Sequence, residues 1–156
     1  MPRKGHIKKR EPQPDVRFNN AAAGRFISAL MMGGKRSTAE KIFYGALEGA
    51  AEKLGVEPFE VFEKAMANVT PSIEVRPRRV GGATYQVPVD VTPERGVQLS
   101  IRWIVSYARA KKGMPMSERL MRELMDAYKN EGASIKRRDD THRMADANRA
   151  FAHYRW

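Results

Sequence analysis

Lysine and arginine are the most numerous ionisable residues in this sequence. The chain carries 29 lysines and arginines against 18 aspartates and glutamates, a formal net charge of +11 at pH 7. Three of the arginines, Arg95, Arg102 and Arg109, recur every seven residues. In a helix this spacing is about two turns, so the three guanidinium groups lie on one stripe and can bridge successive phosphates. The spacing therefore predicts binding of a polyanion.

Other patterns suggest a nucleotide-binding loop or a metal site, but each lacks residues that such a site needs. Gly33-Gly34-Lys35 is missing the Gly-x4-Gly-Lys-Ser/Thr spacing of a phosphate-binding loop, which excludes an NTPase. Asp139-Asp140 suggests a metal site, but we expect this pair at a helix amino terminus, where the helix dipole favours carboxylates. His142 and His153 lie eleven residues apart, whereas two metal ligands on one helix usually lie three or four apart. We predict no metal, no cofactor and no enzymatic activity.

The placement of the charge is as informative as its sum. Residues 39–70 hold three lysines against six glutamates, which makes this block −3 and leaves +14 for the rest of the chain. A solvated lysine face is the ordinary explanation of a charge run, but segregation around an acidic block favours a polyanion partner. A membrane surface is the weaker candidate, because no basic segment carries an opposing apolar face. No small-molecule substrate is indicated.

Length and composition predict one domain. At 156 residues and 42% hydrophobic, the chain is long enough for one core. There is no cysteine, which excludes disulfides, zinc thiolates and a thiol nucleophile. No apolar run approaches the ~20 residues of a membrane span and no signal-peptide core follows Met1, so we expect a soluble, cytoplasmic protein. Residues 1–17 are expected to form a disordered basic tail and residues 18–156 the domain.

Hydrophobic periodicity predicts a mainly α fold, a single bundle of about six helices. The expected helices are 21–32, then one from a cap at Ser37 or Thr38 to a stop at Gly55, and a third that starts near Glu57-Pro58. A fourth is expected from Thr92 as cap, a fifth from Ser117-Glu118 to a stop at Gly132, and a sixth from Asp139-Asp140 to about Ala152.

A β-hairpin arm is predicted between the third and fourth helices, at residues 71–93. Apolar residues alternate with polar ones on both sides of Gly81-Gly82, and one proline in each strand suits a ribbon with two free edges. A two-residue turn would set the two apolar rows on opposite faces, so we expect an odd-length loop that pairs Val75 with Val89. The basic tip at residues 78–82 is interpreted as resting on an anionic partner. A hairpin folded flat on the core, with solvated arginines, remains the alternative.

Further basic and aromatic residues gather at the termini and helix junctions. Phosphate contacts are expected from the tail, from the fourth helix and the loop after it, and from the segment before the sixth helix: Arg3, Lys4, Lys8, Lys9, Arg10, Arg109, Lys111, Lys112, Lys136 and Arg137. Phe151, Tyr154 and Trp156 could stack on bases or fill a groove of a protein partner, and Phe151 could equally belong to the core. Contacts from so many separated segments favour a structured RNA as the ligand.

Two rival classes fit less well. A histone-like DNA protein would also combine helices with basic β-arms, but it would be a shorter, dimeric chain with a proline at the arm tip. Here Pro77 and Pro88 lie within the strands and the tip is Gly81-Gly82. An enzyme that modifies RNA would need a catalytic pair and a cofactor loop, and the sequence shows neither.

Two long strings resemble a known family. Arg-Arg-Val-Gly-Gly-Ala-Thr-Tyr-Gln-Val-Pro-Val at 78–89 and Met-Ala-Asp-Ala-Asn-Arg-Ala-Phe-Ala-His-Tyr-Arg-Trp at 144–156 look like ribosomal protein seven of the bacterial small subunit. The likeness covers nearly all of the chain and is loosest at residues 1–12 and 109–118. It implies a primary binder of the head (3' major) domain of small-subunit ribosomal RNA that nucleates head assembly and lies near the decoding centre and the exit-site transfer RNA.

The resemblance also implies roles for particular residues. Ribosomal RNA contacts are implied for Lys35, Arg36, Arg76, Arg78, Arg79, Arg95 and Arg102. Transfer RNA contacts are implied for Arg79, Gly81, Gly82, Tyr85, Arg143, Met144 and Asn148. Ribosomal proteins nine and eleven are the implied neighbours.

Overall fold

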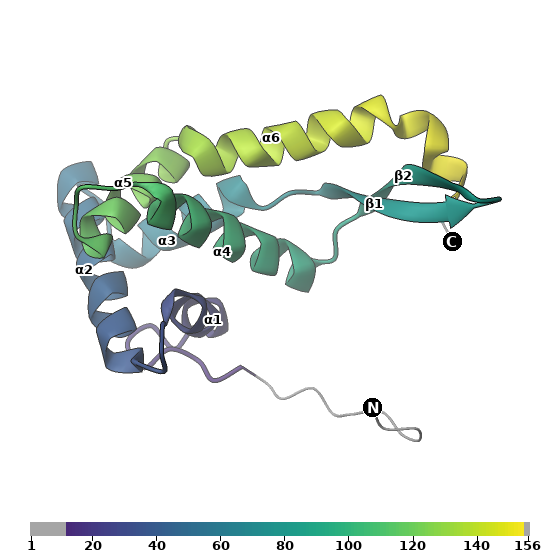
Figure 1. Ribbon diagram of the computed structural model, residues 1–156. Coiled ribbons are helices and arrows are strands. Elements are labelled where there is room, and N and C mark those ends of the chain that lie inside the picture. The colour runs from purple at the N-terminus through teal and green to yellow at the C-terminus, as the bar shows by residue number, and fades with distance from the viewer. Residues whose placement is uncertain (1–11, 155–156) are drawn as a thin grey trace, which may run out of the picture.

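The computed structural model describes residues 12–154 and confirms a mainly helical fold (Figure 1). This part of the chain forms six α-helices, one 3-10 helix and one antiparallel hairpin between α3 and α4. The bounds are α1 Ala21–Leu30, α2 Arg36–Leu54, α3 Pro58–Val69, β1 Ile73–Val80, β2 Ala83–Asp90, α4 Pro93–Ala110, α5 Met116–Tyr128, α6 Gly132–Ala147 and η1 Arg149–Tyr154. None of these helices is long and apolar enough to cross a membrane.

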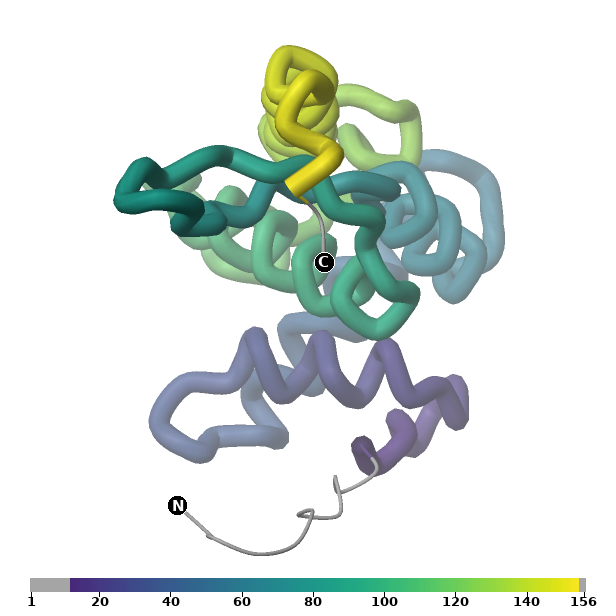
Figure 2. The backbone as a smooth tube through the Cα atoms, turned by 90° about the vertical axis from the view of Figure 1, so that its right-hand side faces the viewer, coloured from purple at the N-terminus to yellow at the C-terminus, as the bar shows by residue number. Residues whose placement is uncertain are grey.

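The helices form a bundle from which the hairpin projects as an arm. Helix α5 packs against α2, α3 and α4, which places it at the centre of the bundle. Helix α6 leaves the bundle in the direction of the arm, and η1 folds back onto β2 (Figure 1). Viewed along the arm, α6, α4 and α1 lie at three successive levels (Figure 2). The arm is therefore supported along its length by the carboxyl-terminal segment.

The core is built from the helical stripes that the periodicity predicts. Phe26, Phe43 and Phe62 come from three different helices, and their ring centroids lie 5.2 to 5.7 Å apart. All three rings are at most 2% exposed. Aromatic pairs at such separations add about 0.5 to 1.5 kcal/mol each to the free energy of burial. This cluster holds α1, α2 and α3 together.

A buried carboxylate joins α4, α5 and α6. Glu123 on α5 is only 1% exposed. Its Oε1 accepts hydrogen bonds from the backbone N–H and the hydroxyl of Ser134, in the first turn of α6, at 3.1 and 2.6 Å. Its Oε2 lies 2.9 Å from Nζ of Lys111, an ion pair rather than an aligned hydrogen bond. Because no side chain of α6 caps its own amino terminus, Glu123 performs that role from a neighbouring helix.

The predicted odd-length loop in the arm is wrong. The turn contains only Gly81 and Gly82, and Val75 pairs with Pro88 instead of Val89. Both glycines have positive φ, 57° and 90°, which the two-residue turn requires and which glycine adopts at little cost. One face of the arm therefore combines a charged row from β1 with an apolar row from β2 that includes the fully buried Val87. The expectation failed because the arm has no single core face that both apolar rows must share.

Several predicted helix ends are also wrong. Helix α2 starts at Arg36, before the expected caps at Ser37 or Thr38. Thr92 is the N-cap residue of α4, as predicted, although its side chain makes no capping hydrogen bond. Helix α6 starts at Gly132, so Asp139 and Asp140 lie inside it and not at its amino terminus. Gly132 does not end α5, which already ends at Tyr128, but is the first residue of α6. The helix also ends early, at Ala147, and continues as η1.

A short segment before α1 is anchored on α2. Asp15 is 1% exposed, and its carboxylate accepts hydrogen bonds from the backbone N–H groups of Arg17 and Phe18. It also accepts one from the Tyr44 hydroxyl at 2.5 Å. Burial, with this hydrogen bond as a second cause, raises the pKa of Tyr44 to about 12. Asp15 thus anchors the segment before α1 to α2, while the predicted disorder of residues 1–11 lies outside the described residues.

Replacing Tyr44 by phenylalanine tests this anchor. Loss of the donor to buried Asp15 is expected to lower the free energy of unfolding by about 1 to 3 kcal/mol at neutral pH. The raised pKa favours the neutral phenol, so wild-type protein keeps this contribution below pH ~10 and loses it as the pH rises towards 12. In urea unfolding, the difference between the two proteins should shrink above pH ~10. If the difference in free energy of unfolding stays constant across that range, the Tyr44 hydroxyl does not anchor the segment through Asp15.

Replacing Glu123 by alanine tests the carboxylate that joins three helices. We expect a loss of about 2 to 4 kcal/mol, because Ser134 loses its acceptor and the partly buried Lys111 loses its closest counter-charge. Arg122→Ala is the matched control, since Arg122 is an exposed charged residue on the same helix. It should change the free energy of unfolding by no more than about 0.5 kcal/mol. Equal effects of the two substitutions would show that Glu123 has no such role.

Candidate nucleic-acid interface

Three arginines line one groove between α1 and α4. The groove has a volume of about 470 Å³, and Arg102 and Arg109 from α4 meet Arg25 from α1 along it. Gln98 and Ser106 add polar groups, while Ala29, Ile101 and Val105 form an apolar floor. In the described part of the chain, neither Arg25 nor Arg102 lies within ion-pair distance of a carboxylate. Guanidinium groups placed in this way suit phosphates.

The predicted stripe on α4 is only partly assembled. Arg102 and Arg109 share the groove, but Arg95 lies at the root of the arm, with its Nε 3.4 Å from Oε2 of Glu74. Glu74 is 7% exposed and also pairs with Arg76 at 2.5 Å. Two predicted RNA-binding arginines therefore serve as partners of one buried carboxylate. Their charge is in part neutralised inside the protein.

Arg109 has a structural contact as well as its place in the groove. Its Nη2 donates hydrogen bonds to the backbone carbonyls of Ala29 and Leu30, both at 3.2 Å. These carbonyls belong to the last turn of α1, where backbone acceptors lack helical partners. Because carbonyls bear no net charge, the guanidinium keeps its full positive charge. Arg109 thus holds α1 against α4 and remains a cation in the groove.

The loop between α1 and α2 places its two cations differently. Lys35 is exposed, whereas Arg36 donates from Nε to Oε1 of Glu40 at 2.8 Å, one turn along α2. A surface pair at this spacing is worth only a few tenths of a kcal/mol, so it constrains Arg36 weakly. Both residues remain accessible to a ligand at the end of α1.

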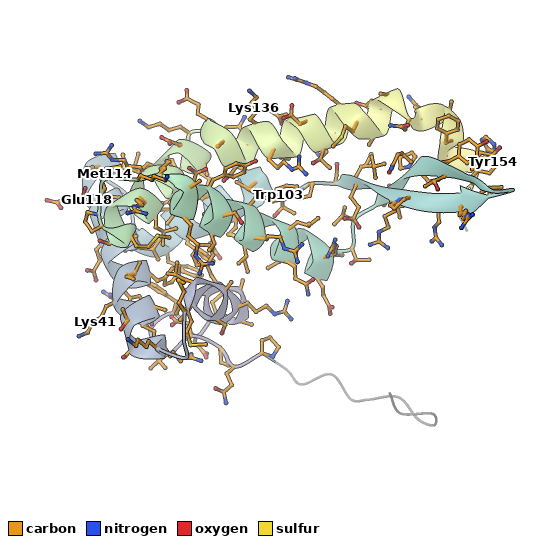
Figure 3. The ribbon with its side chains drawn as sticks, in the orientation of Figure 1. Lys41, Trp103, Met114, Glu118, Lys136 and Tyr154 are labelled. Carbon is orange, nitrogen blue, oxygen red and sulfur yellow. The ribbon has the colours of Figure 1, made fainter. Side chains whose placement is uncertain are left out.

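The cations that follow α4 separate into two kinds. Lys111 pairs with Glu123 at 2.9 Å and with Asp126 at 3.5 Å, which makes it part of the helix junction. Lys112 is exposed. On α6, Lys136 and Arg137 are also exposed, and Lys136 lies on the side of the helix away from the arm (Figure 3). Lys112, Lys136 and Arg137 are not among the residues that line the groove.

The arm carries the residues expected near transfer RNA. Arg79 is exposed beside the tip, and the Gly81-Gly82 turn is open, with nothing near the position that an added Cβ would take. Arg78 is half-buried and has a partner within the chain. The tip thus presents backbone and Arg79 to the surroundings.

Tyr85 is half-buried against η1. Its ring packs between those of Phe151 and Tyr154 on η1, with centroids 5.2 and 5.1 Å away. Figure 3 shows Tyr154 beside the strands of the arm. A residue expected at transfer RNA and two expected at a protein partner therefore meet each other. We call Tyr85, Phe151 and Tyr154 the aromatic clasp.

The remaining carboxyl-terminal candidates lie along α6. Arg143 is highly exposed and 3.7 Å from Asp140, Met144 is 44% exposed, and Asn148 donates to the Met144 carbonyl at 2.7 Å. His142 does not face His153; its Nε2 accepts the Ser72 N–H at 3.1 Å, which ties α6 to the arm root. Among residues 12–154, no three acidic or histidine side chains gather as a metal site would require.

Some candidates cannot be placed, and one was missed. Arg3, Lys4, Lys8, Lys9, Arg10 and Trp156 lie outside the described residues. Arg25 was missed because it is a single cation in an alanine-rich helix, with no repeat to mark it. Only the packing of α1 against α4 brings it to Arg102. The one feature of the sequence that could have indicated Arg25 is its position on the helix that precedes Gly33-Gly34-Lys35.

Comparison with known proteins identifies close relatives. The model of the family described as ribosomal protein S7p/S5e matches residues 2–149. A protein from Thermoanaerobacter pseudethanolicus, named small ribosomal subunit protein uS7, is 56% identical over 156 residues, which is all of both chains. Proteins of the same name from Dictyoglomus turgidum and Dictyoglomus thermophilum are 56% and 57% identical over the same span.

Removing the ring of Tyr85 tests whether the aromatic clasp supports the arm. In Tyr85→Ala, two ring contacts are lost, and amides near the tip should exchange with deuterium about 5- to 100-fold faster. Helices α1 to α5 should keep their protection. Thr84→Ala is the control, because Thr84 is exposed and adjacent but points to the other face. Unchanged exchange at the tip in Tyr85→Ala would show that the clasp contributes nothing to the order of the arm.

Proposed function

This chain belongs to the family of ribosomal proteins S7p/S5e, and we propose from this membership and from its groove that it is a primary binder of the head (3' major) domain of small-subunit ribosomal RNA. It is a structural component of the small ribosomal subunit, resident with the cytoplasmic ribosome, and not an enzyme. As a primary binder it would order its part of the RNA before other proteins join. It would thereby nucleate assembly of the head.

The observation that carries this proposal is the groove between α1 and α4. Arg25, Arg102 and Arg109 converge there from two helices, and the bundle core holds both helices in place. Preformed cations bind phosphates without the entropic cost of ordering a flexible tail. The groove is also separate from the acidic residues of α2 and α3, which would repel RNA. We infer that it binds the RNA backbone.

The other predicted cations extend this footprint to different degrees. Exposed Lys35, Lys112, Lys136 and Arg137 are available for further phosphates, as are Arg3, Lys4, Lys8, Lys9 and Arg10 by composition. Arg36, Arg76, Arg95 and Lys111 already pair with carboxylates of the chain. We propose that these four contribute less, since an RNA phosphate must share them with an existing partner.

A second surface is proposed at the arm tip and the carboxyl terminus. Arg79, Gly81, Gly82, Arg143, Met144 and Asn148 would border the exit-site transfer RNA near the decoding centre, at the subunit interface. Tyr85 would act there indirectly, by holding the tip through the aromatic clasp. Ribosomal proteins nine and eleven are proposed neighbours, with Trp156 and the outer sides of Phe151 and Tyr154 as contacts. Support for this surface is the projection of the arm from the bundle (Figure 1).

The salt dependence of RNA binding tests the groove. Arg25→Ala/Arg102→Ala should weaken binding to the isolated head domain of small-subunit ribosomal RNA. It should also reduce the slope of log affinity against log salt by about 1.4 to 1.8, because each phosphate contact contributes roughly 0.7 to 0.9. Arg109 is left intact because it also holds α1. Lys41→Ala/Lys53→Ala removes the same charge from the exposed side of α2 and should leave the slope nearly unchanged.

Two results would contradict the proposal. The first is an equal loss of slope in both double variants, which would mean that only net charge matters. The second is a preference of the wild-type protein for generic duplex DNA over the head-domain RNA at matched salt. That result would favour an architectural DNA-binding protein.

A further inference from the structure

A second groove adjoins the first and shares one residue with it. It has a volume of about 330 Å³ and lies where the end of α1, the start of α2, the end of α4 and the start of α5 meet. Arg109 lines both grooves. The volume is within the range of about 300 to 1,000 Å³ that small-molecule sites occupy. The two grooves are therefore neighbours, with Arg109 between them.

The walls of this groove are apolar and include flexible methionine side chains. Met32, Ile42 and Met116 supply most of the non-polar side chains. Met32 is 71% exposed, one of the few large hydrophobic residues of the described chain that remain at the surface. A flexible thioether packs well against a flat ring, and an exposed one gains most from a ligand that covers it.

The rim of the groove is cationic. Lys35, Arg109 and Arg119 surround the apolar walls. Arg119 donates from Nε to the carbonyl of Met114, and Arg109 donates to the two carbonyls of α1, so their hydrogen bonds within the chain go to uncharged groups. In the described residues, none of the three lies within ion-pair distance of a carboxylate. The rim therefore favours an anionic ligand that has an apolar, planar part.

We propose that this groove binds one unstacked nucleobase of the RNA whose backbone lies in the groove between α1 and α4. This inference rests on the proposed function and adds a base-binding site to it. A single-stranded nucleotide joins a planar ring to phosphates at a fixed spacing, which matches apolar walls beside a cationic rim. Continuity through Arg109 favours RNA over an acidic peptide, because one strand can occupy both grooves. Exposed Thr38 on the rim can hydrogen-bond to the edge of the base.

Two side-chain truncations separate the base contact from the phosphate contacts. Met32→Ala/Met116→Ala should weaken binding to the isolated head-domain RNA about 3- to 30-fold, through the loss of sulfur contacts with a ring. The salt slope should stay the same, since no cation is removed. Arg119→Ala should weaken binding and reduce the slope by about 0.7, the value for one single-strand phosphate contact. Val16→Ala shortens an exposed hydrophobic side chain outside the groove and is the control.

A photoreactive benzophenone side chain at position 32 provides a readout independent of affinity. In the complex of the full chain with the head-domain RNA, it should label one nucleotide, while the same group at exposed Glu52 should label none. Wild-type affinity of the methionine variant together with no RNA label from position 32 would overturn the proposal. A label on a protein in the reconstituted subunit would overturn it in favour of a peptide. If wild-type protein itself shows no steep salt dependence with this RNA, the proposed function fails first, and the base site fails with it.

Discussion

The position of α6 depends on one buried carboxylate, and the arm depends on α6. Glu123 caps the amino terminus of α6 through Ser134 and pairs with Lys111 at the end of α4. Helix α6 has little amphipathic character of its own, so it is held by this cap, by the packing of Ile135 and by the hydrogen bond that Arg138 donates to the Asn68 carbonyl of α3. From there it reaches the arm root through His142 and strand β2, at Tyr85, through η1. A two-stranded ribbon alone is marginal in water, and this support explains how it can project from the bundle.

The buried carboxylates divide the cations into two classes, those that pair with a carboxylate of the chain and those that do not. Buried Glu74 and Glu123 neutralise cations that hold the arm root and the helix junction. The arginines of the groove between α1 and α4 have no such partner among the described residues. Net charge alone does not distinguish these classes, since both are basic and both lie near the surface. A groove whose arginines have no carboxylate partner is where an RNA backbone would gain most from binding.

The sequence was sufficient for the architecture and insufficient for the contacts. Helical periodicity and the strand alternation predicted the bundle and the hairpin, because both patterns are local. The register of the arm, the start of α6 and the partners of Lys111 depend on which elements meet, which no local pattern encodes. The same reason explains why Arg25 was missed and why the packing of Tyr85 against η1 was not predicted. Family membership indicates ribosomal RNA as a partner, and the grooves are the surface where we propose that it binds.

A cryo-electron microscopy map of small subunits that contain this chain is the most direct test of RNA binding in the groove. Ribosomal RNA backbone should lie in the groove between α1 and α4, with phosphates within hydrogen-bond distance of Arg25 and Arg102. The acidic side of α2 and α3 should carry no RNA. RNA packed on α2 and α3, with protein or solvent in the groove, would show that the groove is not the RNA-binding surface.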